Sequence, residues 1–407
     1  MKKILQVGAD FAGSTGRIEE LIAKKLDEKK VVTTVAYSRG VPINSKRNSI
    51  IIGSKIDNFT HGIMTRFFDR HGFSSAAATI EFVKKLKMLS PDVIHLHNIH
   101  GYYLNVEILF KYLKQTKIPV VWTFHDCWPF TGHCSHFIEV GCQKWKGICF
   151  KCPLVGDYPK SFFVDNSKNN FERKKKAFSD HPNLTIVTPS QWLSDLVGES
   201  FLANYPRVVI NNGVDAGIFK PSNSQKFIRE KYNIEEEFIL LGVAFHWTNS
   251  KGLNVFKELA QKLGAGFKIV LVGVSIQQSI ELSPSIVCVE RTANLEELAA
   301  IYAESDVLVN PTFSDNFPTV NLEALASGIP VITFDTGGSG EAVDKDTGSI
   351  VPVGDINELV RAILEVKSKG KRFYQNSCRK RALAFFDQNL MSSKYVELYQ
   401  KLSCQFE

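Results

Sequence analysis

Residues 314–328 read SDNFPTVNLEALASG and carry two carboxylates, Asp315 and Glu323, on either side of an expected helix start. Pro318 suits the first turn of a helix and Gly328 suits its end, so Asp315 lies in the loop and Glu323 about two turns inside the helix. At a rise of ~1.5 Å per residue, the two side chains leave the backbone at levels roughly 10 Å apart. This is wide for a glycosidase carboxylate pair, so two separate contacts with one ligand fit better. The alternative is an amphipathic helix with two solvated acids.

The stretch lies within a regular alternation of strands and helices. From residue 237 onward, the apolar runs FILLGVAF, FKIVLVGV, SIVCVE, DVLVNP and PVITFD alternate with helix-forming segments. The first half has a similar series, with KILQVG, VVTTVAYS, PDVIHLH and PVVWTFHD. Such alternation predicts an α/β fold with parallel sheets. We expect two Rossmann-like domains that face each other, with ligands bound at the carboxyl ends of the strands.

The length of 407 residues exceeds what one hydrophobic core usually supports. We expect a first domain at residues 1–204 with a cysteine-rich insertion at 127–152. A linker at 205–221, rich in turn formers, precedes a second domain at 222–385. The helix-forming tail, residues 386–407, could pack back on the first domain.

The net charge of +7 is unevenly distributed along the chain. Residues 1–204 carry 28 lysines and arginines against 18 aspartates and glutamates, which favours this half for contact with an anionic surface. Its densest run, ERKKKAF at 172–178, favours a solvated helix face, with contact to anionic lipid as the alternative. We expect no nucleic-acid partner.

The chain contains no apolar run of 18 residues, and Gln6 and Asp10 interrupt the first apolar run. The sequence therefore predicts neither a membrane span nor a cleaved signal. We expect a cytoplasmic protein, or one that lies peripherally on the inner face of the cytoplasmic membrane.

Several candidate site residues follow strands. Gly13 and Gly16 would let backbone N–H groups approach an anion at a helix start, although a tight turn without ligand is the alternative. Their spacing is not the dinucleotide fingerprint, so nicotinamide and flavin are disfavoured. His125 could hydrogen-bond a substrate hydroxyl or be a structural histidine. Lys251, at the entry to a helix, suits a diphosphate but could be an ordinary surface lysine.

Together these positions resemble the retaining family-4 glycosyltransferases, which have the GT-B architecture. The matching motif is D-NFPTVNL-E-AL-A-S-G-I-P-V from Asp315 to Val331, followed by GG-S-G-E and preceded by the linker NNGVD. GSTGRI, TFHDCWPFTGHC, TPSQW and DNFP are most similar to the colanic-acid and capsule branch. The resemblance implies a nucleotide-sugar donor and a glycan or lipid-pyrophosphate-linked acceptor in bacterial surface polysaccharide biosynthesis.

The resemblance also implies roles for residues. Glu323 would hold the ribose hydroxyls of the donor, Asp315 would contact the transferred sugar, and Lys251 would neutralise the leaving diphosphate. The backbone of the loop that follows Asp315, listed as Asn316, Phe317, Pro318 and Thr319, would meet the donor sugar and diphosphate. His125 would line the donor-sugar pocket.

His246 stands where the family has an arginine, and a neutral histidine stabilises less anionic charge. Either Lys251 supplies more of the positive charge that stabilises the diphosphate, or another cation such as Arg17 contributes. The implied mechanism is a front-face displacement in which a donor phosphate oxygen takes the acceptor's proton, and it requires no catalytic metal.

Four cysteines, Cys134, Cys142, Cys149 and Cys152, have a spacing that ends in a CFKC pair typical of a zinc half site. We expect structural zinc, with His133 and His136 as alternative ligands, or else reduced cysteines that pack a loop. Two further readings of the whole chain stay open. One is a sugar-nucleotide epimerase of related architecture, and the other is a degenerate transferase that acts as a scaffold subunit.

Overall fold

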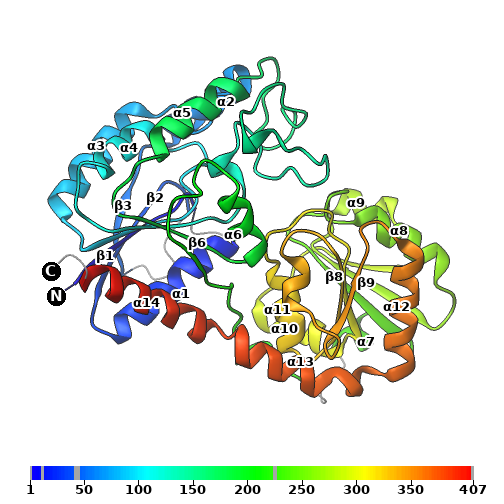
Figure 1. Ribbon diagram of the computed structural model, residues 1–407. Coiled ribbons are helices and arrows are strands. Elements are labelled where there is room, and N and C mark those ends of the chain that lie inside the picture. Colours follow the sequence, from blue (N-terminus) through cyan, green and yellow to red (C-terminus); the bar gives the residue numbers. More distant parts are fainter. Residues whose placement is uncertain (1, 11–12, 41–45, 223–226, 405–407) are drawn as a thin grey trace. The chain divides into compact units, whose positions relative to one another are not determined.

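The computed structural model describes residues 2–10, 13–40, 46–222 and 227–404 (Figure 1). The chain forms two compact units. Unit 1 consists of Met1–Ile210 with Met391–Glu407, and unit 2 consists of Asn211–Leu390. Each unit is an α/β structure built on one parallel sheet, so the predicted pair of Rossmann-like domains is confirmed.

The sheet of unit 1 has seven parallel strands in the order β3-β2-β1-β4-β5-β6-β7. The strands are β1 (Lys3–Val7), β2 (Val32–Tyr37), β3 (Asn48–Ile51), β4 (Val93–Leu96), β5 (Val120–Thr123), β6 (Leu184–Thr188) and β7 (Arg207–Val209). The direction of strand addition reverses between β1 and β4, which is where open α/β sheets bind ligands.

Helices cover both faces of this sheet. They are α1 (Ser14–Glu28), α2 (Lys55–Phe68), α3 (Ala76–Leu89), α4 (Val106–Leu113), α5 (Ser167–Phe178), α6 (Gln191–Gly198) and α14 (Gln388–Cys404). Apolar side chains of α1 and α14 share one core cluster, and those of α3, α4, α5 and α6 share another.

The C-terminal helix α14 is fixed to unit 1 by buried polar contacts as well as apolar ones. The Tyr395 and Thr123 hydroxyls lie 3.1 Å apart, and the Tyr399 hydroxyl lies 2.5 Å from Nδ1 of His95. His95 in turn lies 2.8 Å from the Thr123 hydroxyl. Because unpaired buried polar groups are costly, these bonds fix the position of α14 on the sheet.

Unit 2 has a six-stranded parallel sheet in the order β10-β9-β8-β11-β12-β13. The strands are β8 (Phe238–Val243), β9 (Phe267–Val272), β10 (Ile286–Val289), β11 (Val307–Asn310), β12 (Val331–Phe334) and β13 (Gly348–Val351). Here the strand order reverses between β8 and β11.

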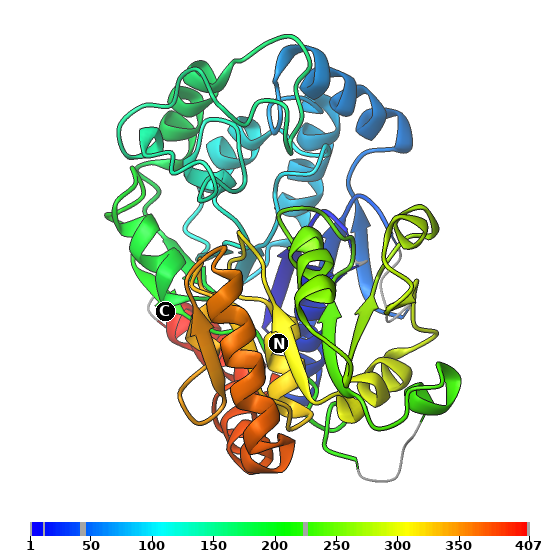
Figure 2. The same ribbon diagram turned by 90° about the vertical axis from the view of Figure 1, so that its right-hand side faces the viewer.

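The helices of unit 2 are α7 (Phe227–Lys231), α8 (Leu253–Lys262), α9 (Ile276–Glu281), α10 (Leu295–Glu304), α11 (Thr319–Ala326), α12 (Ile356–Lys369) and α13 (Lys371–Phe385). Figure 2 shows α8 and α12 side by side in front of this sheet, and they contact each other directly. On the other face, α11 packs against α10 and α13.

Two expectations from the sequence are wrong in detail. The segment 205–221 is not linker throughout, because Arg207–Val209 pairs with β6 as a seventh strand. The basic run at 172–178 does form a helix, but it is not simply a solvated face. Lys174 is 1% exposed, and Arg173 is ion-paired with Glu107 at 2.6 Å.

Candidate active site

In unit 2, two of the predicted site residues meet at the carboxyl edge of the sheet. Lys251 follows β8 and Asp315 follows β11, and these strands are neighbours at the point where the strand order reverses. Lys251 Nζ lies 2.6 Å from Asp315 Oδ2 and donates a hydrogen bond to it. The Lys251 side chain is 38% exposed and that of Asp315 is 21% exposed, so the pair borders solvent.

The two loops that carry this pair are held together by their backbones. The Phe313 N–H donates to the Ser250 carbonyl at 2.8 Å. Gly252 has a φ of 82°, and a Cβ there would lie 2.4 Å from the Pro311 carbonyl oxygen. Only glycine permits both the left-handed conformation and this close approach.

A third loop supports Asp315 from the neighbouring strand β12. The Gly338 N–H donates to the Asp315 carbonyl at 3.3 Å, and Thr336 Oγ1 donates to the Phe313 carbonyl at 2.9 Å. Gly337 has a φ of 56°, and a Cβ there would lie 1.8 Å from the Asp315 carbonyl oxygen. The glycines of the GG-S-G-E motif therefore hold the Asp315 backbone in place.

The helix predicted from the opening stretch is α11, with Pro318 as its N-cap and Thr319 as its first residue. Phe317 is buried, and its carbonyl accepts a hydrogen bond from Asn212 Nδ2 at 3.1 Å. Asn316 is buried in the same loop. The first turn of α11 thus begins four residues after Asp315.

Glu323 lies a little over one turn inside α11 and not two turns, because the helix starts at Thr319. Its side chain is not solvated either, so the alternative of two solvated acids is wrong. Glu323 is buried, and its Oε2 accepts a hydrogen bond from the Tyr302 hydroxyl at 2.8 Å. Tyr302 lies on α10 and is fully buried, so it orients this carboxylate.

His246 lies exposed in the loop after β8, next to the exposed ring of Phe245. The guanidinium of Arg291 lies 5.6 Å from the centre of that ring. Arg291 was not among the predicted site residues, although it follows β10 at the same edge of the sheet. It is a cation of unit 2 near the loop that carries His246.

In unit 1, Gly13 caps α1 with a φ of 95°. It lines a hollow of about 240 Å³, together with Asp10, Thr15, Arg39, Asn98, His100 and Tyr158 among others. Gly16 does not line it, because it is buried within the first turn of α1. Of the two predicted glycines, only Gly13 therefore borders a space where a ligand could lie.

His125 follows β5 and stacks on His97, with 3.2 Å between its Nε2 and His97 Nδ1. Burial lowers the pKa of His125 to about 4, so the imidazole is neutral at neutral pH. The adjacent Asp126 accepts a hydrogen bond from the Trp128 N–H, and its Oδ2 lies 2.9 Å from His100 Nε2. His125 is therefore suited to exchange hydrogen bonds and not to supply positive charge.

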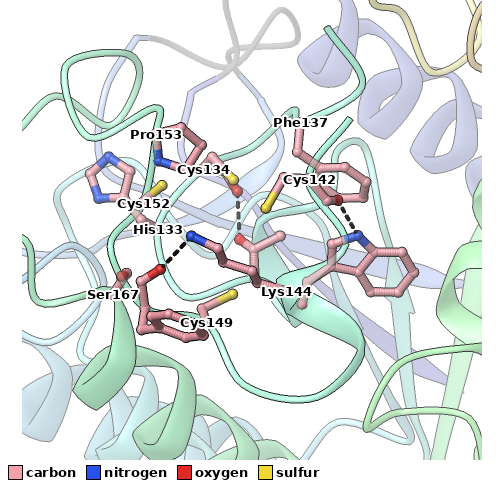
Figure 3. Close-up of a pocket in the computed structure, with 12 residues that line it drawn as sticks. His133, Cys134, Phe137, Cys142, Lys144, Cys149, Cys152, Pro153 and Ser167 are labelled. Carbon is pink, nitrogen blue, oxygen red and sulfur yellow. Dashed lines mark hydrogen bonds between the residues drawn. The ribbon is translucent and has the colours of Figure 1, made fainter. Parts of the chain in front are cut away.

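The four cysteines of the predicted zinc site line one small cavity in unit 1, together with His133 (Figure 3). All four are free thiols. Among the residues that the structure describes, however, no three His, Cys, Asp or Glu side chains form a group that could hold a metal ion as they stand. Zinc therefore stays a prediction at this point.

Two family models match separate parts of the chain. One is described as Glycosyltransferase Family 4 and matches residues 21–217, and the other is described as Glycosyl transferases group 1 and matches residues 236–368. The first covers most of unit 1 and the first seven residues of unit 2, and the second contains Lys251, Asp315 and Glu323. The chain belongs to the family-4 and group-1 glycosyltransferases.

Individual relatives of this glycosyltransferase agree with the family models. The "Putative colanic acid biosynthesis glycosyl transferase WcaC" of Escherichia coli is 27% identical over 322 residues, which is 77% of each chain. An "N,N'-diacetylbacillosaminyl-diphospho-undecaprenol alpha-1,3-N-acetylgalactosaminyltransferase" of Campylobacter jejuni is 24% identical over 289 residues, 67% of this chain and 76% of the relative.

Solved structures share the fold of this glycosyltransferase. A sucrose-phosphate synthase of Thermosynechococcus elongatus superposes with a TM-score of 0.74 at 16% identity and full coverage of both chains. Anabaena HepE, solved in complex with UDP-glucose, gives a TM-score of 0.69 at 13% identity, with 98% of this chain and all of that chain covered. The predicted GT-B fold class is thus confirmed.

The buried histidines of this glycosyltransferase predict a loss of stability in mild acid. Burial lowers the pKa of six histidines in unit 1, listed as His61, His71, His95, His97, His125 and His181. The unfolded chain therefore takes up protons first as the pH falls below about 6.5, and each pKa unit of difference costs about 1.4 kcal/mol. Glu19 and His133, whose pKa values are raised, act in the opposite sense.

Urea unfolding at pH 7.5, 6.5 and 5.5 measures this effect, and we expect the free energy of unfolding to fall steadily with pH. His61→Gln should reduce the slope, because it removes one group whose pKa is lowered to about 3. A constant free energy of unfolding over this range would contradict the prediction.

Proposed function

We propose that this glycosyltransferase moves a sugar from a nucleotide-sugar donor to a glycan or lipid-pyrophosphate-linked acceptor in bacterial surface polysaccharide biosynthesis, with retention of the anomeric configuration. The observation that carries the proposal is the Lys251–Asp315 pair at the start of the helix that bears Glu323. The Escherichia coli relative is named for colanic acid, the Campylobacter jejuni relative for a diphospho-undecaprenol substrate, and HepE was solved with UDP-glucose.

In this proposal Lys251, Asp315 and Glu323 bind different parts of the donor. Glu323, oriented by Tyr302, holds the ribose hydroxyls, and Asp315 contacts hydroxyls of the transferred sugar. Lys251 leaves Asp315 and turns to the diphosphate. Because a partly exposed ion pair contributes only about 0–1 kcal/mol, opening it costs little.

The leaving diphosphate meets several positive groups of unit 2. The N–H groups at the start of α11 and the Lys251 ammonium favour the developing anion. Arg291, near the loop of His246, is a further cation within reach of that loop. We propose that it supplies part of the charge that the family's arginine would provide at position 246.

The chemical step then needs no protein base. The acceptor hydroxyl attacks the anomeric carbon as the bond from that carbon to the phosphate oxygen breaks. A donor phosphate oxygen takes the hydroxyl proton, and the nucleoside diphosphate leaves. The protein contributes positioning and charge stabilisation, and a neutral His125 contributes a hydrogen bond to a sugar hydroxyl. The scheme requires no catalytic metal.

The division of roles between the two carboxylates is testable by ligand-induced thermal shifts. A donor that binds the folded state raises the melting temperature by mass action, so a panel of nucleoside diphosphates and nucleotide sugars identifies the ligand. Glu323→Ala should abolish the shift caused by the nucleotide portion. Asp315→Ala should keep that shift and abolish the extra shift caused by the sugar.

The matched control is Glu281→Ala, which removes an exposed acid from α9 and should bind like the wild type. Equal losses in both site variants would contradict separate roles.

Transfer itself is tested with labelled nucleotide sugars and bacterial membrane lipid extract. We expect label in the lipid fraction, and we expect Lys251→Ala to lower the rate by on the order of 100-fold, because one stabiliser of the leaving charge is lost. An epimer of the free nucleotide sugar, formed without acceptor, would instead identify an epimerase. No product with any donor, together with tight binding to another transferase, would identify a scaffold subunit.

We further propose that unit 1 contacts an anionic membrane surface through one face of α2 and the adjacent segment 162–164. The described residues contain no helix long and apolar enough to cross a bilayer. This "α2 face" consists of the exposed side chains Ile56, Phe59, Ile63, Phe67, Phe68, Phe162, Phe163 and Val164. Ile56, Phe59 and Phe163 are 70% or more exposed, which is unusual for such large apolar side chains.

The two parts of the α2 face form one continuous surface. The Phe162 N–H donates to the Arg66 carbonyl at 2.7 Å, and the rings of Phe67 and Phe163 lie 5.7 Å apart. Lys55, Arg66 and Lys160 are exposed at its border. The nearby acids Asp57 and Asp165 accept hydrogen bonds from the backbone N–H groups of Ser54 and Ser167 at helix starts.

An amphipathic helix with apolar and cationic exposed side chains lies in a membrane interface with its apolar face inserted. Each basic residue near an anionic surface contributes about 1 kcal/mol. This surface replaces the basic run of α5 as the proposed lipid contact, because Lys174 is buried and Arg173 is paired. Contact at the α2 face would bring unit 1 to lipid-linked acceptors.

Vesicle flotation tests the α2 face. The full-length protein should float with phosphatidylglycerol vesicles and much less with phosphatidylcholine vesicles, and Phe59→Ser with Phe163→Ser should reduce flotation at least tenfold. Ile276→Ser with Ile280→Ser, which removes exposed apolar side chains from α9, is the matched control. Membrane contact would be contradicted if the variant with Phe59→Ser and Phe163→Ser floated like the wild type. It would also be contradicted if these substitutions changed the oligomeric state of the protein and left its flotation unchanged.

A further inference from the structure

The cysteine cavity of unit 1 has the chemistry of a metal site and takes no part in the proposed reaction. Its volume is about 10 Å³, close to that of one water-sized sphere. Cys134, Cys142, Cys149 and Cys152 come from different turns of one irregular segment and line the same cavity (Figure 3). Thiolates in such numbers favour zinc over harder cations such as magnesium or calcium.

His133, which lines this cavity, has a buried carboxylate beside one ring nitrogen and, in the part of the chain that the structure describes, no partner for the other. Its Nδ1 lies 2.6 Å from Asp69 Oδ1, and both side chains are completely buried. Its Nε2 is buried and has no hydrogen-bond partner among the described residues. Because an unpaired buried polar atom is costly, this nitrogen points to a group that completes the site.

Backbone N–H groups already point at two of the sulfurs. The Gly132 N–H donates to Cys149 Sγ at 3.2 Å, and the Leu154 N–H donates to Cys152 Sγ. A Cβ at Gly132 would lie 2.7 Å from Cys149 Cβ and 2.2 Å from the Ser167 carbonyl oxygen, so glycine is needed for this approach. N–H donors of this kind stabilise sulfur in its anionic, metal-binding form.

Lys174 places a buried amine beside the cavity. Its Nζ donates to the carbonyls of Trp128 and Thr131 at 2.7 and 3.1 Å. Among the described residues no ion pair joins this amine to a carboxylate, but it interacts electrostatically with Cys149 and Cys134 and, less strongly, with Asp126 and Asp69. A buried cation without a close anion is costly, and zinc bound by four thiolates would supply net negative charge there.

The surrounding segment is of a kind that a cross-link would stabilise. Between β5 and α5, the chain contains only two short 3-10 turns, Trp128–Phe130 and Lys144–Lys146. Yet it buries Trp128, Phe130 and Trp145 almost completely. Long segments without regular structure are uncommon in compact domains, and closing one with a metal reduces the entropy of its unfolded state.

We propose that Cys134, Cys142, Cys149 and Cys152 bind one structural zinc ion as thiolates, and that the Asp69–His133 pair and Lys174 support it from outside the ligand set. Four thiol protons are released to solvent as the four zinc–sulfur bonds form. The sulfurs do not yet converge on one point. Rotation about the single side-chain torsion of each cysteine changes the direction of its sulfur, and the proposal requires such rotations to bring the four sulfurs together in the shared cavity. His133 Nε2 then hydrogen-bonds a metal-bound sulfur.

Metal analysis of the full-length protein, purified without a metal-affinity step, tests this site. We expect about one zinc per chain and no stoichiometric iron. Cys149→Ser and Cys152→Ser should lose the zinc. Cys127→Ser is the matched control, because Cys127 is buried in the same segment but does not line the cavity, and it should keep the zinc.

A second measurement covers the case in which a cysteine variant does not fold. Mercurial titration of the wild type in the presence of a zinc indicator should release the ion as the thiols react. Chelator should make the segment 127–166 sensitive to protease. Wild-type protein without zinc, or with iron in its place, would overturn the proposal. Zinc that persists in Cys142→Ser but is lost in His133→Gln would overturn the ligand set.

Discussion

The donor side of this glycosyltransferase depends on the close backbone packing of the loops that follow β8 and β11. The Phe313 to Ser250 hydrogen bond and the approach of Gly252 to Pro311 leave no room for a side chain between the loops. Their separation sets the distance between Lys251 and Asp315. Because both loops leave adjacent parallel strands, the constraint originates in the strand order of the sheet.

This close packing also explains why the motif that begins at Asp315 and the GG-S-G-E motif are rich in glycine and in helix-forming residues. Gly337 and Gly338 let a third loop touch the Asp315 backbone, and α11 carries Glu323 into the interior beside Tyr302. The site is thus rigid in its backbone, while Lys251 and Asp315 at the solvent edge remain free to exchange partners. A rigid frame with weakly paired charges suits binding of a charged ligand without large rearrangement.

The elements of unit 1 are held in place in a different way. Its sheet is covered on one face by α1 and α14, and α14 is fixed by buried tyrosine hydroxyls. On the other side, the segment between β5 and α5 buries large aromatic residues without regular structure. The proposed zinc site belongs to this segment, as do Phe162, Phe163 and Val164 of the α2 face.

The sequence by itself determined the α/β alternation and the start of α11, because these follow from local periodicity and capping, whereas the Lys251–Asp315 pair appears only in the tertiary structure. It also determined the family, through the motif from Asp315 to Val331. The seventh strand β7, the burial of Lys174 and the support of Glu323 by Tyr302 were decided only by the tertiary structure. They depend on contacts between residues distant in sequence, and no local pattern of charge or hydrophobicity reports which side chain another element will cover. Arg291 is an intermediate case, since its position after a strand was visible but its approach to Phe245 was not.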